Sequence, residues 1–487
     1  MHRVNFLAAA LAVTTTVASA TFPVTTSDAQ AQAAVDRGLF LYYAYDGVDA
    51  AREFEQATRR DPRLAIGYWG IALAVGPDLN TRMSQSQFDL GVRAMQSALP
   101  LTAALPDRQR RFVEIMALRY RGSFADWSAD DAAYRRALFD FAESSHDENA
   151  ELLAAEALLE HSGLGWANRT PASDEARTAL QLIAGVLRDD PSNVMANHLC
   201  IHLYDEAPDR APALPCAQRL DSTIFPPQAE HLAHMPAHYW IETGAYAKAL
   251  ASSERAYELM AQLTALEPDS PNVERYTKHD VAVGYSAAMM LGNYATAQRW
   301  SERMSAAFGT GFDAITDLRF GRYDAAYAAT GNQFAGAAVR GLAALHLGQF
   351  AAARPIAAGM PASASLPGYL AQIFFGELAA AEGNVEQADR WIERARANQR
   401  ANHEAELIPL LPADEALGAI RLRRGDDSGA VAAFDAALAA YPNDARALAG
   451  LAQALRALGD ASQASATEDA FKKQWEGADT NAAGILP

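Results

Sequence analysis

Histidine is concentrated in one short part of this chain. Five of its eleven histidines fall between residues 198 and 238, namely His198, His202, His231, His234 and His238. Successive members of each group stand three or four residues apart, a spacing that places side chains on one face of an α-helix. Imidazole is the commonest protein ligand for transition metals. The pattern therefore predicts two helix faces that could ligate metal.

Two further residues extend this candidate site. Asp205 follows His202 by three residues on the same predicted face, and His279 lies in a later predicted helix. A donor set of imidazoles with one carboxylate favours copper, zinc or iron over calcium and magnesium, which prefer oxygen ligands. The six histidines could hold one ion or two, so the sequence leaves a mononuclear and a dinuclear centre open.

The two cysteines, Cys200 and Cys216, allow two interpretations. Cys200 lies inside the first histidine helix and could be a thiolate ligand. Alternatively, its helix and the helix of Cys216 would be antiparallel neighbours across a turn at Pro208–Pro212, which makes a disulfide sterically reasonable in an oxidising compartment.

The elements that must position these residues are all predicted to be helices. Apolar residues recur at steps of three and four, and alternating β-branched runs are almost absent. Ala50, Phe54, Ala57 and Pro62 have the same spacing as Ala430, Phe434, Ala437 and Pro442. This spacing resembles the second helix of a tetratricopeptide repeat (TPR). The resemblance covers most of the chain and implies an all-α solenoid of antiparallel helix pairs.

The resemblance also implies a position for each candidate ligand. In TPR proteins the first helix of a pair lines the concave groove, mainly with the second, fifth, ninth, twelfth and thirteenth residues of the repeat. With Val194 as the first residue, His198, His202 and Asp205 are fifth, ninth and twelfth. In the next repeat Glu230 is the first residue, and the second, fifth and ninth are His231, His234 and His238. In the repeat after that Lys278 is the first residue and His279 is the second. We therefore expect all seven residues to face one groove, with His202 and His234 as central ligands.

A narrower resemblance concerns the histidine segments themselves. His198 and His202, followed by the run His231-Leu232-Ala233-His234-Met235-Pro236-Ala237-His238, are similar to an HxxxH…HLxHMPxH signature in exported bacterial TPR proteins of unknown function. The segment Gly67–Pro77 is also similar to that group, whereas the two cysteines are a departure from it. The resemblance implies a common site but no known reaction. Motifs of serine hydrolases, HExxH metalloproteases, P-loop NTPases and CxxC redox proteins are absent from the sequence.

The N-terminus has the features of a secretory signal peptide. Arg3 precedes an apolar run from Phe6 to Val13, and Ala18-Ser19-Ala20 matches the small residues at a signal-peptidase site. We therefore expect a secreted or periplasmic protein. The net charge of −18 argues against nucleic acid as a partner, and no later apolar stretch is long enough for membrane insertion. The predicted organisation is a signal peptide (1–20), an N-terminal linker (21–34), a TPR-like solenoid (35–474) with the histidine-rich region at 194–290 and C-terminal repeats at 369–472, and a flexible tail (475–487).

Three functions fit these features. The first is a metalloprotein with the metal in the groove, either an enzyme dependent on copper, iron or zinc or a protein without catalytic activity. The second is a scaffold that binds a protein or peptide in the concave groove without catalysis. The third is metal storage or delivery. Metal analysis separates the second from the others, whereas the sequence identifies no substrate or reaction.

Overall fold

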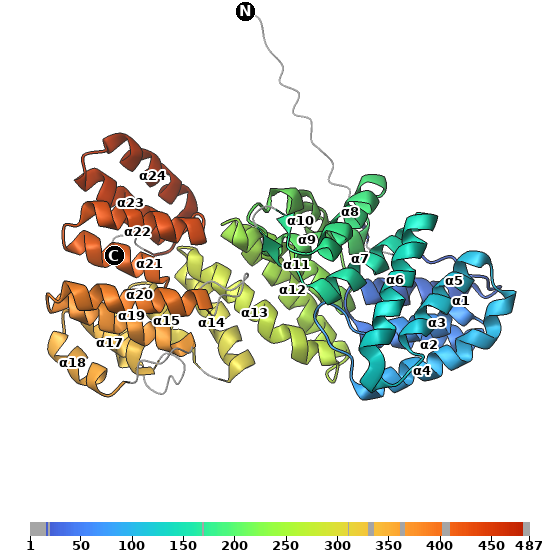
Figure 1. Ribbon diagram of the computed structural model, residues 1–487. Coiled ribbons are helices and arrows are strands. Elements are labelled where there is room, and N and C mark those ends of the chain that lie inside the picture. Colours follow the sequence, from blue (N-terminus) through green and yellow to red (C-terminus); the bar gives the residue numbers. More distant parts are fainter. Residues whose placement is uncertain are drawn as a thin grey trace, which may run out of the picture. The chain divides into compact units, whose positions relative to one another are not determined.

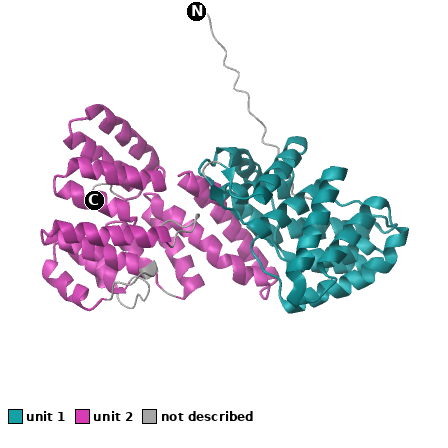
Figure 2. Ribbon diagram, in the orientation of Figure 1, with its two compact units in different colours: residues 1–236 teal, residues 237–487 magenta. Residues whose placement is uncertain are grey.

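The structure is a computed structural model and describes residues 16–17, 20–167, 170–309, 311–329, 336–360, 366–401 and 410–480 (Figure 1). The chain forms two compact units, residues 1–236 and 237–487 (Figure 2). The division falls inside helix α11 (Glu230–Glu242), so this helix carries His231 and His234 in the first unit and His238 in the second.

The described residues of the first unit are mostly helical. Its α-helices are α1 (Ala29–Tyr43), α2 (Gly47–Arg60), α3 (Ala65–Ala74), α4 (Gln85–Ala98), α5 (Asp107–Arg119), α6 (Trp127–Ser145), α7 (Glu148–Ser162), α8 (Asp174–Asp189), α9 (Val194–Asp205) and α10 (Leu214–Asp221). Short 3-10 helices are η1 (Leu99–Ala104), η2 (Phe124–Asp126), η3 (Ala211–Ala213) and η4 (Pro227–Ala229). Two strand pairs are also present, β1 (Thr16–Val17) parallel to β4 (Thr223–Ile224) and β2 (Trp166–Ala167) antiparallel to β3 (Thr170–Pro171).

The second unit contains the remaining helices. They are α12 (Tyr246–Leu266), α13 (Pro271–Met290), α14 (Tyr294–Phe308), α15 (Asp313–Arg319), α16 (Tyr323–Ala328), α17 (Gly336–His346), α18 (Phe350–Ala358), α19 (Leu366–Ala381), α20 (Val385–Ala401), α21 (Ala413–Arg423), α22 (Asp427–Ala440), α23 (Ala445–Ala457) and α24 (Ala461–Gln474). Successive helices pack in pairs, such as α12 with α13, α19 with α20 and α21 with α22.

An aromatic residue holds successive helices together. Phe54 of α2 is fully buried between Gly38 of α1 and Gly70 of α3, where a Cβ at Gly70 would lie 2.1 Å from the ring. Phe434 of α22 is enclosed in the same way, and a Cβ at Gly450 of α23 would lie 2.2 Å from its ring. Each phenylalanine lies the same number of residues from the glycine of the preceding helix as from the glycine of the following helix. Glycine is required here because it lets neighbouring helices close around the ring.

Several turns inside the helix pairs share one feature. A glycine with positive φ stands directly before the N-cap residue of the second helix, as at Gly244, Gly321, Gly348, Gly383, Gly425 and Gly459. Glycine adopts this left-handed conformation without the steric penalty of a Cβ. At some of these turns the N-cap side chain also accepts a backbone hydrogen bond, as Asp426 and Asp460 do from Gly429 and Gln463.

The prediction of an all-α TPR-type helical-repeat fold is confirmed. The predicted signal peptide lies outside the described residues except for Thr16, Val17 and Ala20. The segment predicted as a linker is packed in part, since Phe22 is fully buried and its amide donates to Asp36. None of the described helices is long and apolar enough to cross a bilayer.

The beginning of the predicted tail is also in contact with the repeats. The carboxylate of Asp479 accepts hydrogen bonds from the amides of Tyr294 and Ala295 at the start of α14. Residues 481–487 of the predicted tail lie outside the described residues.

Candidate metal centre

Two helices position the first group of histidines. Helix α9 begins at Val194 because the side chain of Asn193 caps it by accepting from the amide of Ala196. The helix presents His198 and His202 four residues apart. Helix α11 supplies His231 in its first turn and continues through Pro236.

The histidines of this group converge in the interior of the first unit. His198, His202 and His231 are 0%, 6% and 2% exposed, and each offers a ring nitrogen within 4.8 Å of those of the other two. The Nε2 atoms of His198 and His231 are 3.1 Å apart. Two nitrogens bound at 2.0–2.1 Å to one tetrahedral ion would be about 3.3 Å apart. The separation therefore suits two ligands of one ion.

The orientation of His198 is fixed from its other side. Its Nδ1 lies 3.0 Å from the carbonyl oxygen of Tyr43, at the end of α1. A carbonyl oxygen can only accept, so Nδ1 donates the proton and Nε2 keeps its lone pair. Histidine ligands in metalloproteins are commonly oriented by such a hydrogen bond from the remaining ring nitrogen. The tautomer of His198 is thus the one that a metal ligand needs.

Tyr45 is part of this site, although sequence analysis did not identify it. Its ring lies 4.4 Å from that of His198, 6.0 Å from that of His202 and 5.6 Å from that of His231, measured between centroids. Its φ is 58°, and it stands directly before the N-cap residue Asp46, where other repeats have glycine. A buried tyrosine in this conformation costs about 1–2 kcal/mol. Its packing against the histidines offsets that cost.

Asn80 connects the group to solvent. Its amide nitrogen lies 3.5 Å from Nε2 of His231, and the residue is exposed. Asn80 belongs to the short segment between α3 and α4. The segment therefore brings a polar side chain from the protein surface to Nε2 of His231.

A second pair of histidines lies in the second unit. The Nε2 atoms of His238 in α11 and His279 in α13 are 3.4 Å apart. His238 is buried and His279 is half-buried. His234 precedes His238 by four residues on α11 and therefore shares its helix face, and its ring centroid lies 6.4 Å from that of His231. Helix α11 thus carries candidate ligands of both histidine groups, His231 for the first and His238 for the second.

The other candidate residues have different positions. Asp205 ends α9 and is half-buried, but its carboxylate is not in the group formed by His198, His202 and His231. Cys200 forms a disulfide with Cys216, with their Cα atoms 6.4 Å apart. The bridge joins α9 to α10, and Cys200 lies between His198 and His202 in the sequence of α9. A disulfide sulfur is not a thiolate, so Cys200 is not a ligand in this state.

The donor chemistry fits a transition metal. Buried imidazoles are nitrogen donors without charge, a set that suits zinc, copper and iron and does not suit calcium or magnesium. Three histidines also match the number of protein ligands in catalytic zinc sites that keep one position open.

Comparison with known proteins gives little beyond the fold. No protein-family description matches the sequence, and no curated protein matches it. Similar solved structures include the human IFIT1 dimer with m7Gppp-AAAA, at 11% identity and a TM-score of 0.31 over 92% of this chain and 91% of that chain. They also include yeast Tom70, at 11% identity and a TM-score of 0.26 over 92% of each chain. The APC/C hetero-tetramer Cut9-Hcn1 matches at 16% identity and a TM-score of 0.30, over 91% of this chain and 97% of that chain.

These similarities are too weak to carry an argument about function. The identity values and TM-scores transfer neither a ligand nor a partner to this chain. Conclusions about the site therefore depend on its own residues.

Proposed function

We propose that the protein binds a transition metal ion, copper, zinc or iron, through His198, His202 and His231. The observation that carries this proposal is the convergence of three buried imidazoles from two helices, with Nε2 of His198 only 3.1 Å from Nε2 of His231. The hydrogen bond from His198 to the Tyr43 carbonyl supports the same conclusion, because it leaves a lone pair facing the other rings.

His238 and His279 are proposed ligands of a second ion. Their 3.4 Å separation supports this extension, since it also lies near the spacing of two nitrogens on one tetrahedral ion. The number of ions bound per chain tests it. One equivalent supports the first group alone, and two equivalents support both.

The role of the metal could be catalysis, storage or delivery. A bound zinc, copper or iron ion would supply Lewis-acid or redox chemistry. The protein's own contribution would be to orient the imidazoles through Tyr43 and Tyr45. Three protein ligands would leave a fourth position open on a tetrahedral ion, as in catalytic zinc sites. A turnover assay on the loaded protein would separate catalysis from storage.

An interaction scaffold is the second candidate function. Helical-repeat folds commonly present extended surfaces to partner proteins, and this fold is of that type. A protein or peptide partner remains compatible with a metal site. Export to the periplasm or the extracellular space is part of the proposal as well, supported by the sequence of residues 1–20.

Metal content is the measurement that tests the proposed function. The purified chain without residues 1–20, reconstituted separately with zinc, copper and iron and then desalted, should retain at least one equivalent of one of them. Binding should weaken below about pH 6, because imidazole with its usual pKa near 6.5 must lose a proton to ligate. Mass-spectrometric metal analysis across pH 5–8 provides the readout. Negligible retention of all three metals at pH 8 would leave the scaffold as the better explanation.

Replacing Tyr45 by glycine should weaken metal binding while the chain still folds. Six other turns of this type already have glycine with positive φ, so the backbone accepts the change. The loss of the ring removes the support packed against His198, and such outer-shell changes commonly cost about 10–100-fold in metal affinity. Competition titration with a chromophoric chelator gives the affinity, and circular dichroism checks the fold. An affinity equal to that of the parent protein would show that Tyr45 does not support the ligands.

A further inference from the structure

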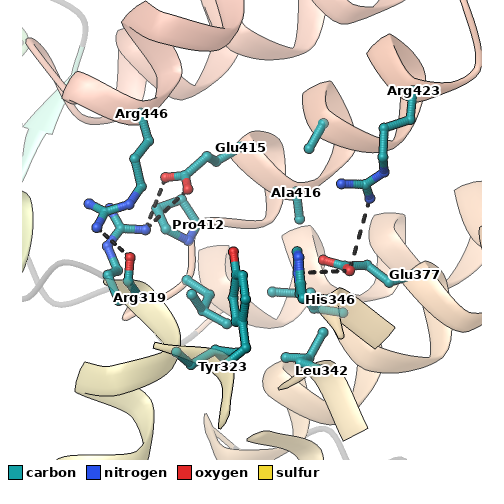
Figure 3. Close-up of a pocket in the computed structure, with 14 residues that line it drawn as sticks. Arg319, Tyr323, Leu342, His346, Glu377, Pro412, Glu415, Ala416, Arg423 and Arg446 are labelled. Atoms are coloured by element: carbon teal, nitrogen blue, oxygen red, sulfur yellow. Dashed lines mark hydrogen bonds and ion pairs between the residues drawn. The ribbon is translucent and has the colours of Figure 1, made fainter. Parts of the chain in front are cut away.

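A polar cavity lies in the second unit, far in sequence from the histidine groups (Figure 3). Its walls come from five helices, α15, α16, α17, α19 and α21, and from Arg446 of α23. The cavity volume is about 80 Å³, which corresponds to roughly half a dozen water molecules. An occupant of this cavity must therefore be small.

The charges in the cavity form two groups. On one side, Arg319 lies 3.0 Å from Glu415, and Arg446 lies beside Arg319 (Figure 3). On the other side, His346 lies 3.3 Å from Glu377, which is also 3.9 Å from Arg423. Tyr323 stands between the two groups, with its ring stacked on that of His346 at 4.6 Å. The wall thus contains three guanidinium groups and two carboxylates.

Among the described residues, Arg446 is a buried arginine of the cavity wall without a close ion pair, although Glu415 and Asp444 act on its charge from further away. It is 3% exposed, and no carboxylate lies within 4.0 Å of its guanidinium in the part of the chain that the structure describes. Its hydrogen bonds go to the backbone carbonyls of Met289 and Arg319, which satisfy donors but carry no opposite charge. A buried cation in this situation attracts an anion.

The pKa shifts of the charged groups in the cavity also favour the binding of an anion. Burial, together with the positive charge of Arg319, lowers the pKa of Arg446 to about 9. Burial raises the pKa of Glu415 to about 7, although Arg319 opposes that shift. Asp444 lies behind Arg319 at 3.8 Å and supplies one more negative charge. The raised pKa reduces the negative charge that Glu415 contributes near neutral pH, which favours an anion beside the arginines.

A second hydrogen-bond donor and an apolar part of the wall limit which small molecules fit the cavity. The hydroxyl of Tyr323 makes no hydrogen bond within the described part of the chain, and it points into the cavity (Figure 3). Leu342, Ile373 and Ala416 form apolar wall between the charged groups. An inorganic anion would leave this apolar surface uncovered, whereas a short organic acid would cover it.

We propose that this cavity binds a small organic carboxylate of about four to seven non-hydrogen atoms. Its carboxylate accepts hydrogen bonds from the guanidinium of Arg446 and the hydroxyl of Tyr323. Its short apolar part lies against Leu342 and Ala416. The site is independent of the metal proposal, because none of its residues belongs to either histidine group.

Calorimetric titration of the full mature chain tests the site with butyrate, butyramide and inorganic phosphate as probes. Butyrate should bind, and butyramide should bind at least about tenfold more weakly, because it lacks the charge that pairs with an arginine. Phosphate should bind more weakly than butyrate. Equal binding of butyrate and butyramide would overturn the proposal, and so would tighter binding of phosphate.

Variants locate the binding. Ala416→Met fills the cavity without removing a charge and should weaken butyrate binding at least about tenfold. Arg446→Lys keeps the charge but loses the paired donors, and it should also weaken binding. Arg340→Ala, an exposed arginine of α17 outside the cavity, is the matched control and should bind as the parent does. Undiminished binding by a folded Ala416→Met protein would place butyrate elsewhere and refute the site.

A tetrapeptide with a free C-terminus, and its amidated form, distinguish the source of the carboxylate. The cavity volume favours a free small acid, so the peptide should bind no more tightly than butyrate. Tighter binding of the free peptide than of butyrate, lost on amidation, would overturn the size limit and identify a chain end as the ligand.

Discussion

His231→Ala is expected to lower affinity for the metal at the first site by about a hundredfold or more. His231 is the only member of the first group that α11 supplies, and its Nε2 faces that of His198 at 3.1 Å. Its removal leaves two ligands from α9 alone, which enclose an ion poorly. The decrease should exceed that of Tyr45→Gly, because Tyr45 supports the ligands without being one. Chelator competition on the reconstituted protein gives both values.

Two variants make this result specific. His146→Ala removes an exposed histidine whose side chain is 83% accessible, so it should leave metal affinity unchanged. His279→Ala removes a residue of the second pair and should leave the first site occupied. Circular dichroism of metal-free His231→Ala establishes that the variant folds. Full metal occupancy in folded His231→Ala would refute the proposed first site.

The sequence was sufficient to predict the helices and the faces that carry the histidines. Local spacing determines which side of a helix a residue occupies, so His198 with His202, and His234 with His238, could be placed without a structure. The repeat spacing also identified Phe54 and Phe434 as equivalent positions, and both are fully buried in the structure. These features depend on contacts between residues that are close in the chain.

The remaining parts of the site depend on distant segments. The carbonyl of Tyr43 is 155 residues from His198, and Asn80 is 151 residues from His231. No periodicity connects such positions, because they meet only through the packing of repeats. Tyr45 did carry a signal, since it occupies a turn position where other repeats have glycine. An unfavourable residue at a position with a strict conformational demand indicates a site.

The polar cavity of the second unit also depends on segments that are distant in the sequence. His346 is isolated in the sequence, and its spacing to other polar residues follows no pattern. In the structure it lies beside Glu377 and Tyr323, which come from α19 and α16. Arginines and carboxylates are common in helical repeats, so composition alone could not distinguish those that face this cavity from those in solvent.

A buried ion network supports the elements that carry the first site. Arg119, at the end of α5, is 1% exposed and donates to Asp131 in α6 and Glu160 in α7, both at 2.9 Å. Burial raises the pKa of Glu160 to about 8, and the charge of Arg119 opposes this rise. Helix α7 also holds Glu156, which accepts a hydrogen bond from the hydroxyl of Tyr42 at 2.6 Å. Tyr42 immediately precedes Tyr43, the acceptor of the His198 hydrogen bond.

Arg119→Met should therefore lower the free energy of unfolding by about 3–5 kcal/mol at pH 9, the usual cost of leaving a buried charge without its partner. The matched control is Arg121→Met, whose side chain is 56% exposed and pairs with Asp130, and its cost should be about 0–1 kcal/mol. Urea unfolding of both variants and the parent provides the comparison. Similar costs for the two arginines would show that the buried network contributes little.

The pH dependence of the Arg119→Met effect follows from Glu160. A carboxyl whose folded pKa is raised holds its proton more firmly when folded, so it lowers stability as pH rises from about 4.5 to its folded pKa of about 8. Removing Arg119 raises that pKa further, and the decline continues to higher pH. The difference in unfolding free energy between parent and variant should consequently be larger at pH 9 than at pH 6. If the difference in unfolding free energy between the parent and Arg119→Met became smaller towards pH 9, Glu160 would not be the carboxylate that loses its compensating charge.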